Sequence, residues 1–329
     1  MKKILILGGT GFVGRHLCEK LTQLQWRVTV PTRREARAKD IQMLPALDVF
    51  EADVHDEATL TRLLACHDAV VNLVAILHGT EQAFEKTHVE LPRKLARACQ
   101  AAGVRRVVHV SALGADARNP DSAPSMYLRS KGHGEVVLQH ADLSLTLLRP
   151  SVMFGNGDKF LNTFAKLQTI FPVIPLAAAG AVFQPVWVED VAEAITFCLQ
   201  DENTHATAGH TFEACGPDVF TLRQLVELAG RVSGVNEGHG RRIIALPKGL
   251  GRAQAALMRL APGEPMLSRD NLDSMSAPNM ASGNLPGLKD LGITPSSLEA
   301  VAPSYLGPAS GGWGLRSNLM LKRKTSGRF

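Results

Sequence analysis

Residues 3–14 read KILILGGTGFVG, and this stretch decides the fold. A short apolar run leads directly into Gly8, Gly11 and Gly14, and an amphipathic segment follows them. A buried strand, a glycine turn and a helix in this order are typical of the first unit of a nucleotide-binding α/β domain. Gly8 permits a tight turn, Gly11 lets the backbone approach a pyrophosphate, and Gly14 lets the helix pack against the strand. Free N–H groups at the helix start would stabilise the anion; the alternative is a glycine turn with only a structural role.

Strand-like and helix-like segments alternate through the first 150 residues. Apolar runs predict strands at 3–7, 27–31, 49–52, 69–75, 106–110 and 144–148. Helical spacing predicts helices at 12–24, 57–65, 84–102 and 126–140, with Pro92 either kinking the third helix or marking its true start. Nearly continuous apolar strands that alternate with helices indicate a parallel sheet covered on both faces. The predicted fold class is therefore α/β, a Rossmann-type doubly wound parallel sheet with a smaller C-terminal substrate lobe.

Regularity declines after Pro150, which indicates a second structural unit. Helices are predicted at 159–170, at 190–199 with Asp190 as its cap, at 221–232 with Thr221 as its cap, and at 248–260. We assign residues 1–150 to a nucleotide-binding Rossmann domain and 151–302 to a mixed α/β substrate lobe, part of which is expected to return to the Rossmann sheet. Residues 303–329 are rich in Gly and Ser and are expected to form a poorly ordered basic tail.

The basic excess of the chain is confined to its C-terminal end. The 329 residues include 36 Lys and Arg against 31 Asp and Glu, a net charge of +5. Residues 300–329 hold 5 of those basic residues and no acidic one, so 31 basic and 31 acidic residues remain in the body. The body shows no interleaved basic and aromatic residues, and we expect no nucleic-acid binding. The tail could contact an acidic partner or anionic lipid.

Cysteine usage and apolar stretches indicate the compartment. The 5 cysteines are scattered and form no C-x-x-C pair, which favours a reducing environment over a disulfide framework. The N-terminus reads as a first strand rather than a signal peptide, and prolines interrupt the longest apolar stretch, 170–188. We expect a soluble, cytoplasmic protein, with a location peripheral to the inner membrane as the alternative. That alternative depends on 248–260, which could lie on a membrane surface, although a lid helix packed on the substrate lobe is the more ordinary interpretation.

Two arginines follow the second predicted strand, where a nucleotide-binding fold that selects NAD would usually offer an acid to the ribose. The string PTRREAR offers Thr32, Arg33 and Arg34 instead. A guanidinium can form two hydrogen bonds with a 2′-phosphate, so we expect NADP(H), with NAD(H) as the alternative. A solvated basic turn is the structural alternative. Asp53 and Val54, after the third strand, are placed to meet adenine, unless Asp53 only caps the next helix.

Ser111, Tyr127 and Lys131 form a candidate catalytic set. Ser111 closes the fifth predicted strand, and Tyr127 and Lys131 lie four residues apart on a predicted helix, so they share a face. A lysine one turn from a tyrosine is expected to lower the pKa of the phenol. That phenol can then exchange a proton with a carbonyl or hydroxyl while hydride moves to or from nicotinamide. The alternative is cofactor binding without chemistry, with Lys131 holding the ribose hydroxyls.

Two histidines near this set are assigned structural roles. His109 lies on an apolar strand and is interpreted as a satisfied core residue. His88 follows the fourth strand and is expected at the surface rather than at the cofactor. The acidic residues are too dispersed to predict a metal site, so none is expected.

Together these motifs resemble the short-chain dehydrogenase/reductase superfamily in its extended or atypical branch. The glycine turn, Asp53, the NLVA run at 72–75, Ser111 and the Tyr127/Lys131 pair carry this likeness. Over residues 1–275 the chain is similar to a narrower group, the nucleotide-binding accessory subunit of respiratory complex I (alpha-subcomplex subunit nine) and its free-standing bacterial relatives. The strings that carry this second likeness are HVELPRKLARACQAAGVRRVVHVSALGAD, YLRSKGHGE, LRPSVMFGNGDKFLNTFA and QPVWVEDVAEAI.

The resemblance implies a set of cofactor contacts spread over four segments. By likeness, the pyrophosphate would lie along Thr10, Gly11, Phe12 and Val13, the 2′-phosphate at Arg33, the ribose along Leu73, Val74 and Ala75, and the nicotinamide beside Pro150, Ser151 and Val152. In the mitochondrial relative NADPH is held structurally, bacterial relatives are described as NAD(P)-binding or NAD-dependent epimerase/dehydratase-like proteins, and some relatives are tied to quinone biosynthesis.

Two functions follow. The first is an NADP(H)-dependent oxidoreductase, or an epimerase/dehydratase-like enzyme, that uses Ser111, Tyr127 and Lys131 on a small-molecule substrate which the sequence does not identify. The second is a non-catalytic NADPH-binding accessory or assembly factor, linked to respiratory complex I or quinone metabolism and in peripheral contact with a membrane or respiratory complex. Because the chain starts without a mitochondrial presequence and the likeness fades near its end, we expect that it does not assemble into complex I.

Overall fold

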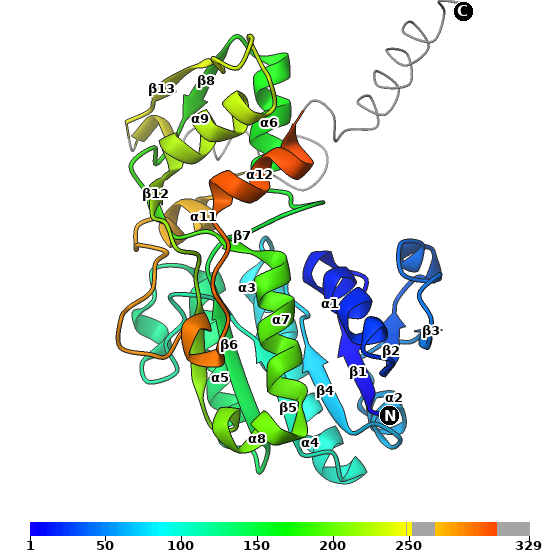
Figure 1. Ribbon diagram of the computed structural model, residues 1–329. Helices are drawn as coiled ribbons and strands as arrows, with labels where there is room; N and C mark the ends of the chain where they lie inside the picture. Colours follow the sequence, from blue (N-terminus) through cyan, green and yellow to red (C-terminus); the bar gives the residue numbers. More distant parts are fainter. Residues whose placement is uncertain (248, 252–266, 308–329) are drawn as a thin grey trace, which may run out of the picture.

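The computed structural model describes residues 1–247, 249–251 and 267–307, and Figure 1 shows a larger lobe built on a seven-stranded sheet. The strand order is β11-β6-β5-β4-β1-β2-β3, and every neighbouring pair runs parallel. The order reverses between β1 and β4, the switch point of a doubly wound sheet. The predicted fold class is confirmed. The strands are β1 (Lys3–Leu7), β2 (Arg27–Thr32), β3 (Leu47–Glu51), β4 (Ala69–Asn72), β5 (Arg106–Val110), β6 (Ser144–Pro150) and β11 (Thr211–Ala214).

Helices cover both faces of this sheet, because neighbouring residues of a strand point to opposite sides. Ile4 and Ile6 pack into one core with α1 (Phe12–Gln23) and α7 (Val188–Leu199). Leu5 and Leu7 pack into another core with α2 (Glu57–Leu64), α4 (Leu91–Ala102) and α5 (Met126–Gln139). All four strand side chains are fully buried. Burial on both faces explains why the opening strand reads as a continuous apolar run.

The segment predicted as one helix over 84–102 consists of three pieces. α3 (Glu81–Glu85) runs into a π-helical turn, η2 (Lys86–Glu90), and α4 begins at Leu91. Because α3, η2 and α4 follow one another without a break, Pro92 lies inside one longer helical segment, directly after the π-helical turn, and the alternative that it marks the true start of the helix is wrong. Other short helical turns are η1 (Glu35–Ala38), η3 (Pro120–Ser122) and η4 (Leu288–Leu291).

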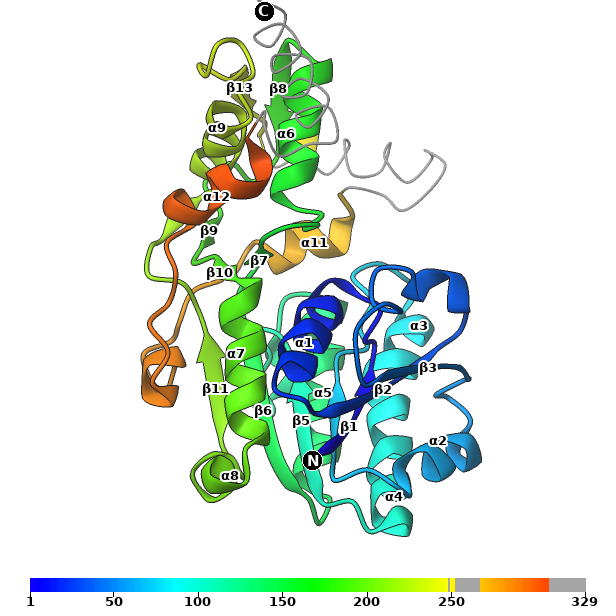
Figure 2. The same ribbon diagram turned by 45° about the vertical axis from the view of Figure 1, so that its right-hand side comes forward.

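The chain leaves the large sheet after β6 and returns to it, as expected. β11 pairs with β6, and α7, which packs against α1, is joined to β11 through α8 (Asp201–Thr207), as Figure 2 shows. α7 begins at Val188 with Trp187 as its N-cap residue, so the prediction that Asp190 caps this helix is wrong. Asp190 lies inside the first turn, where its carboxylate accepts hydrogen bonds from the Ser296 N–H (2.7 Å) and hydroxyl (3.1 Å).

The smaller lobe lies above one end of the large sheet and has its own core (Figure 2). Thr221 caps its helix α9 in a complete capping box, as predicted. Its elements are β7 (Met153–Phe154), α6 (Leu161–Ile170), β8 (Val173–Leu176), β9 (Val182–Phe183), β10 (Val186–Trp187), β12 (Phe220–Thr221), α9 (Leu222–Val232), β13 (Arg242–Ala245), α11 (Arg269–Ser274) and α12 (Leu298–Leu306).

The end of the described chain is folded rather than extended. α12 includes Pro303 and ends at Leu306, whose side chain is buried in the core of the smaller lobe. The boundary placed at residue 303 therefore falls inside a packed helix. Residues 308–329 of the expected tail, and 248 and 252–260 of the helix predicted over 248–260, lie outside the described residues.

Candidate active site

The turn between β1 and α1 forms a backbone cradle at the switch point of the sheet. Gly8 has a φ of +85°, a conformation that favours glycine, and its carbonyl accepts a hydrogen bond from the Gly11 N–H at 2.9 Å. A Cβ on Gly14 would lie 2.5 Å from the Gly8 carbonyl oxygen, so the helix packs directly on the turn. Gly11 begins α1 without a side-chain cap, which leaves the first N–H groups of the helix available to an anion.

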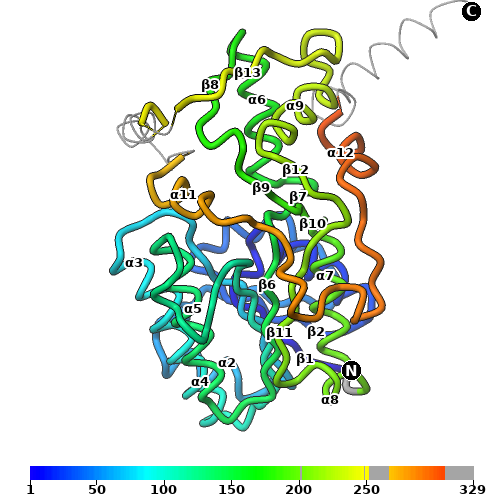
Figure 3. Tube along the Cα trace, turned by 90° about the vertical axis from the view of Figure 1, so that its left-hand side faces the viewer, coloured from blue at the N-terminus to red at the C-terminus, as the bar shows by residue number. Residues whose placement is uncertain are grey.

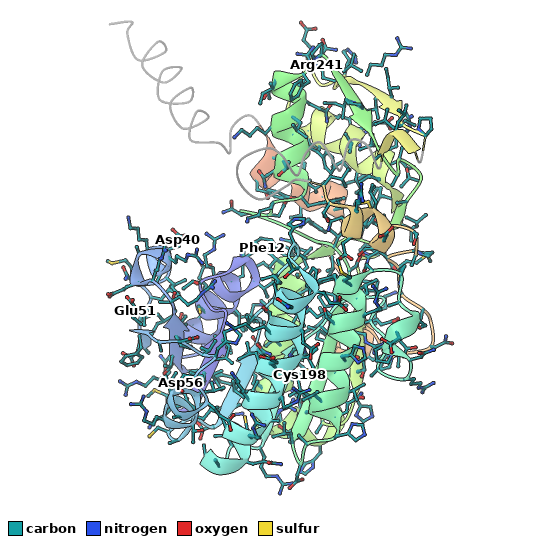
Figure 4. The ribbon with its side chains drawn as sticks, turned by 180° about the vertical axis from the view of Figure 1, so that it is seen from behind. Phe12, Asp40, Glu51, Asp56, Cys198 and Arg241 are labelled. Atoms are coloured by element: carbon teal, nitrogen blue, oxygen red, sulfur yellow. The ribbon has the colours of Figure 1, made fainter. Side chains whose placement is uncertain are left out.

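The side chains of the remaining residues in this turn lie in different surroundings. Val13 is buried in the core between the sheet and α7, so only its backbone can meet a pyrophosphate. The Phe12 ring packs edge-on against His16, with ring centres 5.6 Å apart. Figure 4 places Phe12 at the end of α1 that faces the smaller lobe. Thr10 lies in the turn itself and is half-buried. The glycine turn therefore lies at the end of the larger lobe that faces the smaller lobe.

The end of β2 presents two free cations. Arg33 and Arg34 are exposed, and neither forms an ion pair within the described part of the chain. The Thr32 hydroxyl donates to the Arg34 carbonyl oxygen at 3.2 Å and so shapes this turn. Asp53 is exposed, and its carboxylate accepts a hydrogen bond from the His55 N–H at 2.9 Å. α2 is capped by Asp56 instead, so the alternative that Asp53 caps this helix is excluded.

The backbone that leaves β4 borders the glycine turn. A Cβ on Gly8 would lie 3.1 Å from the Leu73 carbonyl carbon and 3.2 Å from the Val74 nitrogen. The strand predicted to continue to Ala75 ends at Asn72, whose side-chain oxygen accepts a hydrogen bond from the Val74 N–H at 3.2 Å. Residues 73–75 therefore form an exit segment beside the cradle, where the resemblance places the ribose.

Ser111 and Lys131 meet at the end of β5. The Lys131 side chain, 2% exposed, donates from Nζ to the carbonyl oxygen of Val110 at 3.0 Å, next to Ser111 in the chain. The Ser111 hydroxyl is buried and has no hydrogen-bond partner in the described structure. Because an unpaired buried hydroxyl is costly, this atom marks a place where a ligand oxygen or a water fits. Desolvation lowers the pKa of Lys131 to about 8, although the nearby Glu135 charge opposes the shift.

The pKa of Tyr127 shifts in the opposite direction from the one predicted. Burial raises the pKa of its hydroxyl above the ordinary value, because a phenolate would lose its hydration there. The ring packs edge-on against Phe84 and His88, with ring centres 6.3 and 5.6 Å away. The expectation that Lys131 lowers the pKa of this phenol is therefore corrected. Lys131 donates to Val110 and is itself shifted toward the neutral form by burial, so desolvation outweighs any attraction.

The start of α5 is held by a residue that sequence reasoning missed. The Asp270 carboxylate in α11 accepts hydrogen bonds from the Met126 and Tyr127 N–H groups at 2.7 and 3.1 Å. The Ser274 hydroxyl donates to that of Ser125, the N-cap residue of α5, at 2.7 Å. Figure 3 shows α11 of the smaller lobe lying over α5. Asp270 lies 144 residues from Met126, so no local pattern could have assigned it.

The segment after β6 is held by Asn279, which was also missed. The Ser151 hydroxyl donates to the Asn279 side-chain oxygen at 2.6 Å, and the Val152 N–H donates to the same oxygen at 3.0 Å. Pro150 is the last residue of β6. Ser151 is 4% exposed, and its hydroxyl is used in the hydrogen bond to Asn279. At Ser151, therefore, only the backbone can border a nicotinamide.

His88 and His109 each differ in one respect from what the sequence predicted: His88 in its exposure, and His109 in its hydrogen bonding. His88 is 2% exposed, so its expected place at the surface is wrong; it lies on the π-helical turn beside Tyr127. His109 is 2% exposed in the core, as expected, and the Asn72 amide donates to its Nδ1 at 3.0 Å. Its Nε2 has no partner in the described structure, so it is only half satisfied.

These features define an NAD(P)-binding protein of the extended short-chain dehydrogenase/reductase type. The chain belongs to the NAD dependent epimerase/dehydratase family, whose family model matches residues 4–214. The match contains the glycine turn, the Ser111, Tyr127 and Lys131 set, and the returning strand β11.

The chain is also similar to several curated proteins. The chain is 31% identical to mouse NADH dehydrogenase (ubiquinone) 1 alpha subcomplex subunit 9, mitochondrial, over 303 residues, which cover 89% of this chain and 77% of that protein. The Arabidopsis thaliana protein of the same name is 29% identical over 316 residues, 92% and 76% of the two chains. A ceramide reductase of Caulobacter vibrioides is 30% identical over 200 residues, 59% and 60% of the two chains.

Solved structures share the fold at low sequence identity. An epimerase from Methanothermobacter thermautotrophicus has a TM-score of 0.73 at 16% identity, and covers 98% of this chain and 94% of its own. UDP-glucose 4-epimerase from Thermotoga maritima has a TM-score of 0.69 at 19% identity, with 96% and 99% covered. None of the helices within the described residues has the length and hydropathy needed to cross a membrane.

Proposed function

We propose that this protein is an NADP(H)-dependent oxidoreductase that reduces a carbonyl with Ser111, Tyr127 and Lys131. The observation that carries the proposal is the Ser111 hydroxyl, which is buried beside the end of β5 and has no hydrogen-bond partner among the residues that the structure describes. A substrate oxygen bound between this hydroxyl and that of Tyr127 would satisfy a donor that is otherwise costly to bury. An epimerase/dehydratase-like enzyme would use the same three residues.

A Tyr127 hydroxyl that stays protonated can serve as the proton donor in a reduction. Bound NADPH would supply a hydride to the carbonyl carbon. The Tyr127 hydroxyl, kept protonated by burial, donates its proton to the carbonyl oxygen, so a ketone becomes an alcohol. Ser111 donates a hydrogen bond to the same oxygen. Lys131, one helical turn from Tyr127, donates to the Val110 carbonyl, and a ribose hydroxyl would compete for that hydrogen bond.

NADP(H) is the proposed cofactor because Arg33 and Arg34, directly after β2, form no ion pair with an acidic residue in the described part of the chain. Leu73, Val74 and Ala75 would border the ribose, and residues 150–152 would border the nicotinamide through their backbone.

Turnover tests the proposal directly. The full-length protein is mixed with NADPH and, separately, a long-chain ketone, a quinone and a nucleotide sugar, and the loss of NADPH absorbance is followed. We expect turnover with one class, and a loss of about 10² to 10⁴-fold in Tyr127→Phe, because the proton donor is removed. The chain has 2 tyrosines, so Tyr305→Phe, in the core of the smaller lobe, is the matched control. Equal trace rates in wild type and Tyr127→Phe would sink the proposal.

A second candidate is a non-catalytic accessory protein that holds NADPH for a respiratory or quinone-linked membrane complex. The name of the mouse and Arabidopsis relatives supports it. Under this function the purified protein retains NADPH, turns over none of the three carbonyl classes, and co-purifies with a membrane or respiratory partner. Rapid exchange of the nucleotide together with turnover argues against it.

A further inference from the structure

His88 lies at the centre of a directed chain of hydrogen bonds. The Ile76 N–H donates to His88 Nε2 at 3.1 Å, and the His88 Nδ1 lies 2.8 Å from the Ser130 hydroxyl. The Ser130 hydroxyl in turn donates to the Tyr127 carbonyl oxygen at 2.8 Å. An amide N–H can only donate, so Nε2 carries no proton. The proton of the neutral ring is therefore on Nδ1, which donates to Ser130.

This arrangement requires an uncharged ring. A protonated imidazole would point an N–H at the Ile76 N–H, and two donors cannot share one hydrogen bond. Burial, with the nearby Lys131 charge, also lowers the pKa of His88 to about 2. His88 therefore exchanges no proton at ordinary pH, and its role is to hold two segments in place.

The π-helical turn brings His88 to this position. η2 inserts a wider turn between α3 and α4, and such turns are frequent at functional sites. α5 approaches so closely that a Cβ on Gly134 would lie 2.0 Å from the His88 carbonyl oxygen. The ring is enclosed by Phe84 and Tyr127, each with its ring centre 5.6 Å away. Its orientation is thus fixed from several sides.

The two segments joined by the ring are those on which the site depends. Ile76 directly follows the exit segment 73–75, which borders Gly8. Ser130 and Tyr127 belong to α5, which also carries Lys131. We infer that His88 is a positioning residue that fixes the cofactor-facing exit of β4 relative to the Tyr127 helix. The inference depends on the proposed function only in that the exit segment contacts the dinucleotide.

The tautomer of His88 gives a test that does not depend on turnover. Full-length protein labelled with ¹⁵N-histidine is titrated from pH 5.5 to 8, and long-range ¹H–¹⁵N correlations are recorded. The His88 signals are identified by their loss in His88→Gln or His88→Phe. We expect an Nδ1–H tautomer whose signals do not change over this range of pH. An Nε2–H tautomer, or a His88 that becomes protonated in this range, overturns the inference.

A pair of substitutions separates the two hydrogen bonds. A glutamine amide reaches the position of Nε2 and can still accept from Ile76, whereas an asparagine amide reaches only the position of Nδ1. We expect His88→Asn to weaken NADPH binding about tenfold, with faster hydrogen exchange at the Ile76 amide, and His88→Gln to weaken it by less than about threefold. His133→Gln, on α5 and partly exposed, is the control, because its ring pairs with Asp121 and is hydrogen-bonded to neither Ile76 nor Ser130.

Each outcome of this experiment decides the inference. Equal losses in the two variants, or no loss in either, overturn the positioning role. Should wild type bind no NADPH, the proposed function fails, while the tautomer still decides whether His88 holds the two segments as described.

Discussion

At the scale of single residues, burial sets the protonation of the ionisable groups in the site. Tyr127 is kept as a phenol and Lys131 is shifted toward neutrality, both because charge is poorly solvated there. A buried lysine that donates only to a backbone carbonyl stabilises the fold little. A ligand oxygen that accepts a hydrogen bond from this ammonium would stabilise the buried charge more than the fold alone does.

Lys131→Met is therefore expected to stabilise the protein while it weakens cofactor binding. The pKa of Lys131 is about 8 in the folded protein and near 10.5 when unfolded. The buried charge costs stability below pH 8, and that cost falls as the pH rises toward 10.5. We expect a gain of about 2 kcal/mol in the free energy of unfolding at pH 7, shrinking by pH 10, measured by urea denaturation.

Lys166→Met serves as the control for this measurement, because Lys166 is exposed on α6 and should change stability by less than about 0.5 kcal/mol at either pH. A loss of stability in Lys131→Met at pH 7 would show that the ammonium is well accommodated, contrary to the burial argument.

At the scale of elements, α5 is fixed by contacts that come from distant parts of the chain. Asp270 holds its first turn, His88 reaches it from η2, and Arg149 of β6 grips Glu135 through two hydrogen bonds of 2.9 and 2.5 Å. Glu135 is fully buried, so its charge depends on the hydrogen bonds from Arg149 and on the nearby Lys131 charge. The helix that carries the candidate catalytic residues thus has little freedom to shift.

Arg149→Met is expected to lower the free energy of unfolding by about 3–5 kcal/mol, because it leaves the Glu135 carboxylate buried without a partner. The double variant Glu135→Leu/Arg149→Met should recover most of that loss, since the Glu135 carboxylate is no longer buried without its arginine. Arg105→Met, which breaks the exposed pair with Asp142, should cost less than about 1 kcal/mol in the same urea titrations. A double variant as unstable as Arg149→Met would contradict the explanation that the unpaired Glu135 carboxylate causes the loss of stability.

Sequence patterns predicted the elements that depend on local spacing. The β1 turn and the position of Tyr127 and Lys131 on one helix follow from glycine spacing and helical periodicity. His88 could not be placed, because Lys86 and Glu90 beside it are typical of a solvated face and the π-helical turn changes the register of that face. Asp270 and Asn279 act across more than a hundred residues, and only tertiary packing brings them to the site.

At the scale of the whole molecule, the two lobes meet along the carboxyl ends of the parallel strands, where ligands bind in folds of this kind (Figure 1). The chain crosses between the lobes repeatedly: β11 and η4 belong with the larger lobe, and α11 and α12 with the smaller. A cofactor laid across the glycine turn would therefore contact backbone from both halves.

The affinity for NADPH relative to NADH is the measurement that tests this account most directly. Each nucleotide is titrated into the full-length protein and into Arg33→Ala/Arg34→Ala, and binding is followed by nucleotide fluorescence. We predict that wild type binds NADPH at least about tenfold more tightly than NADH, and that the double variant loses this preference while its NADH affinity changes less than about threefold. Equal affinities in wild type, or no binding of either nucleotide, would contradict the account.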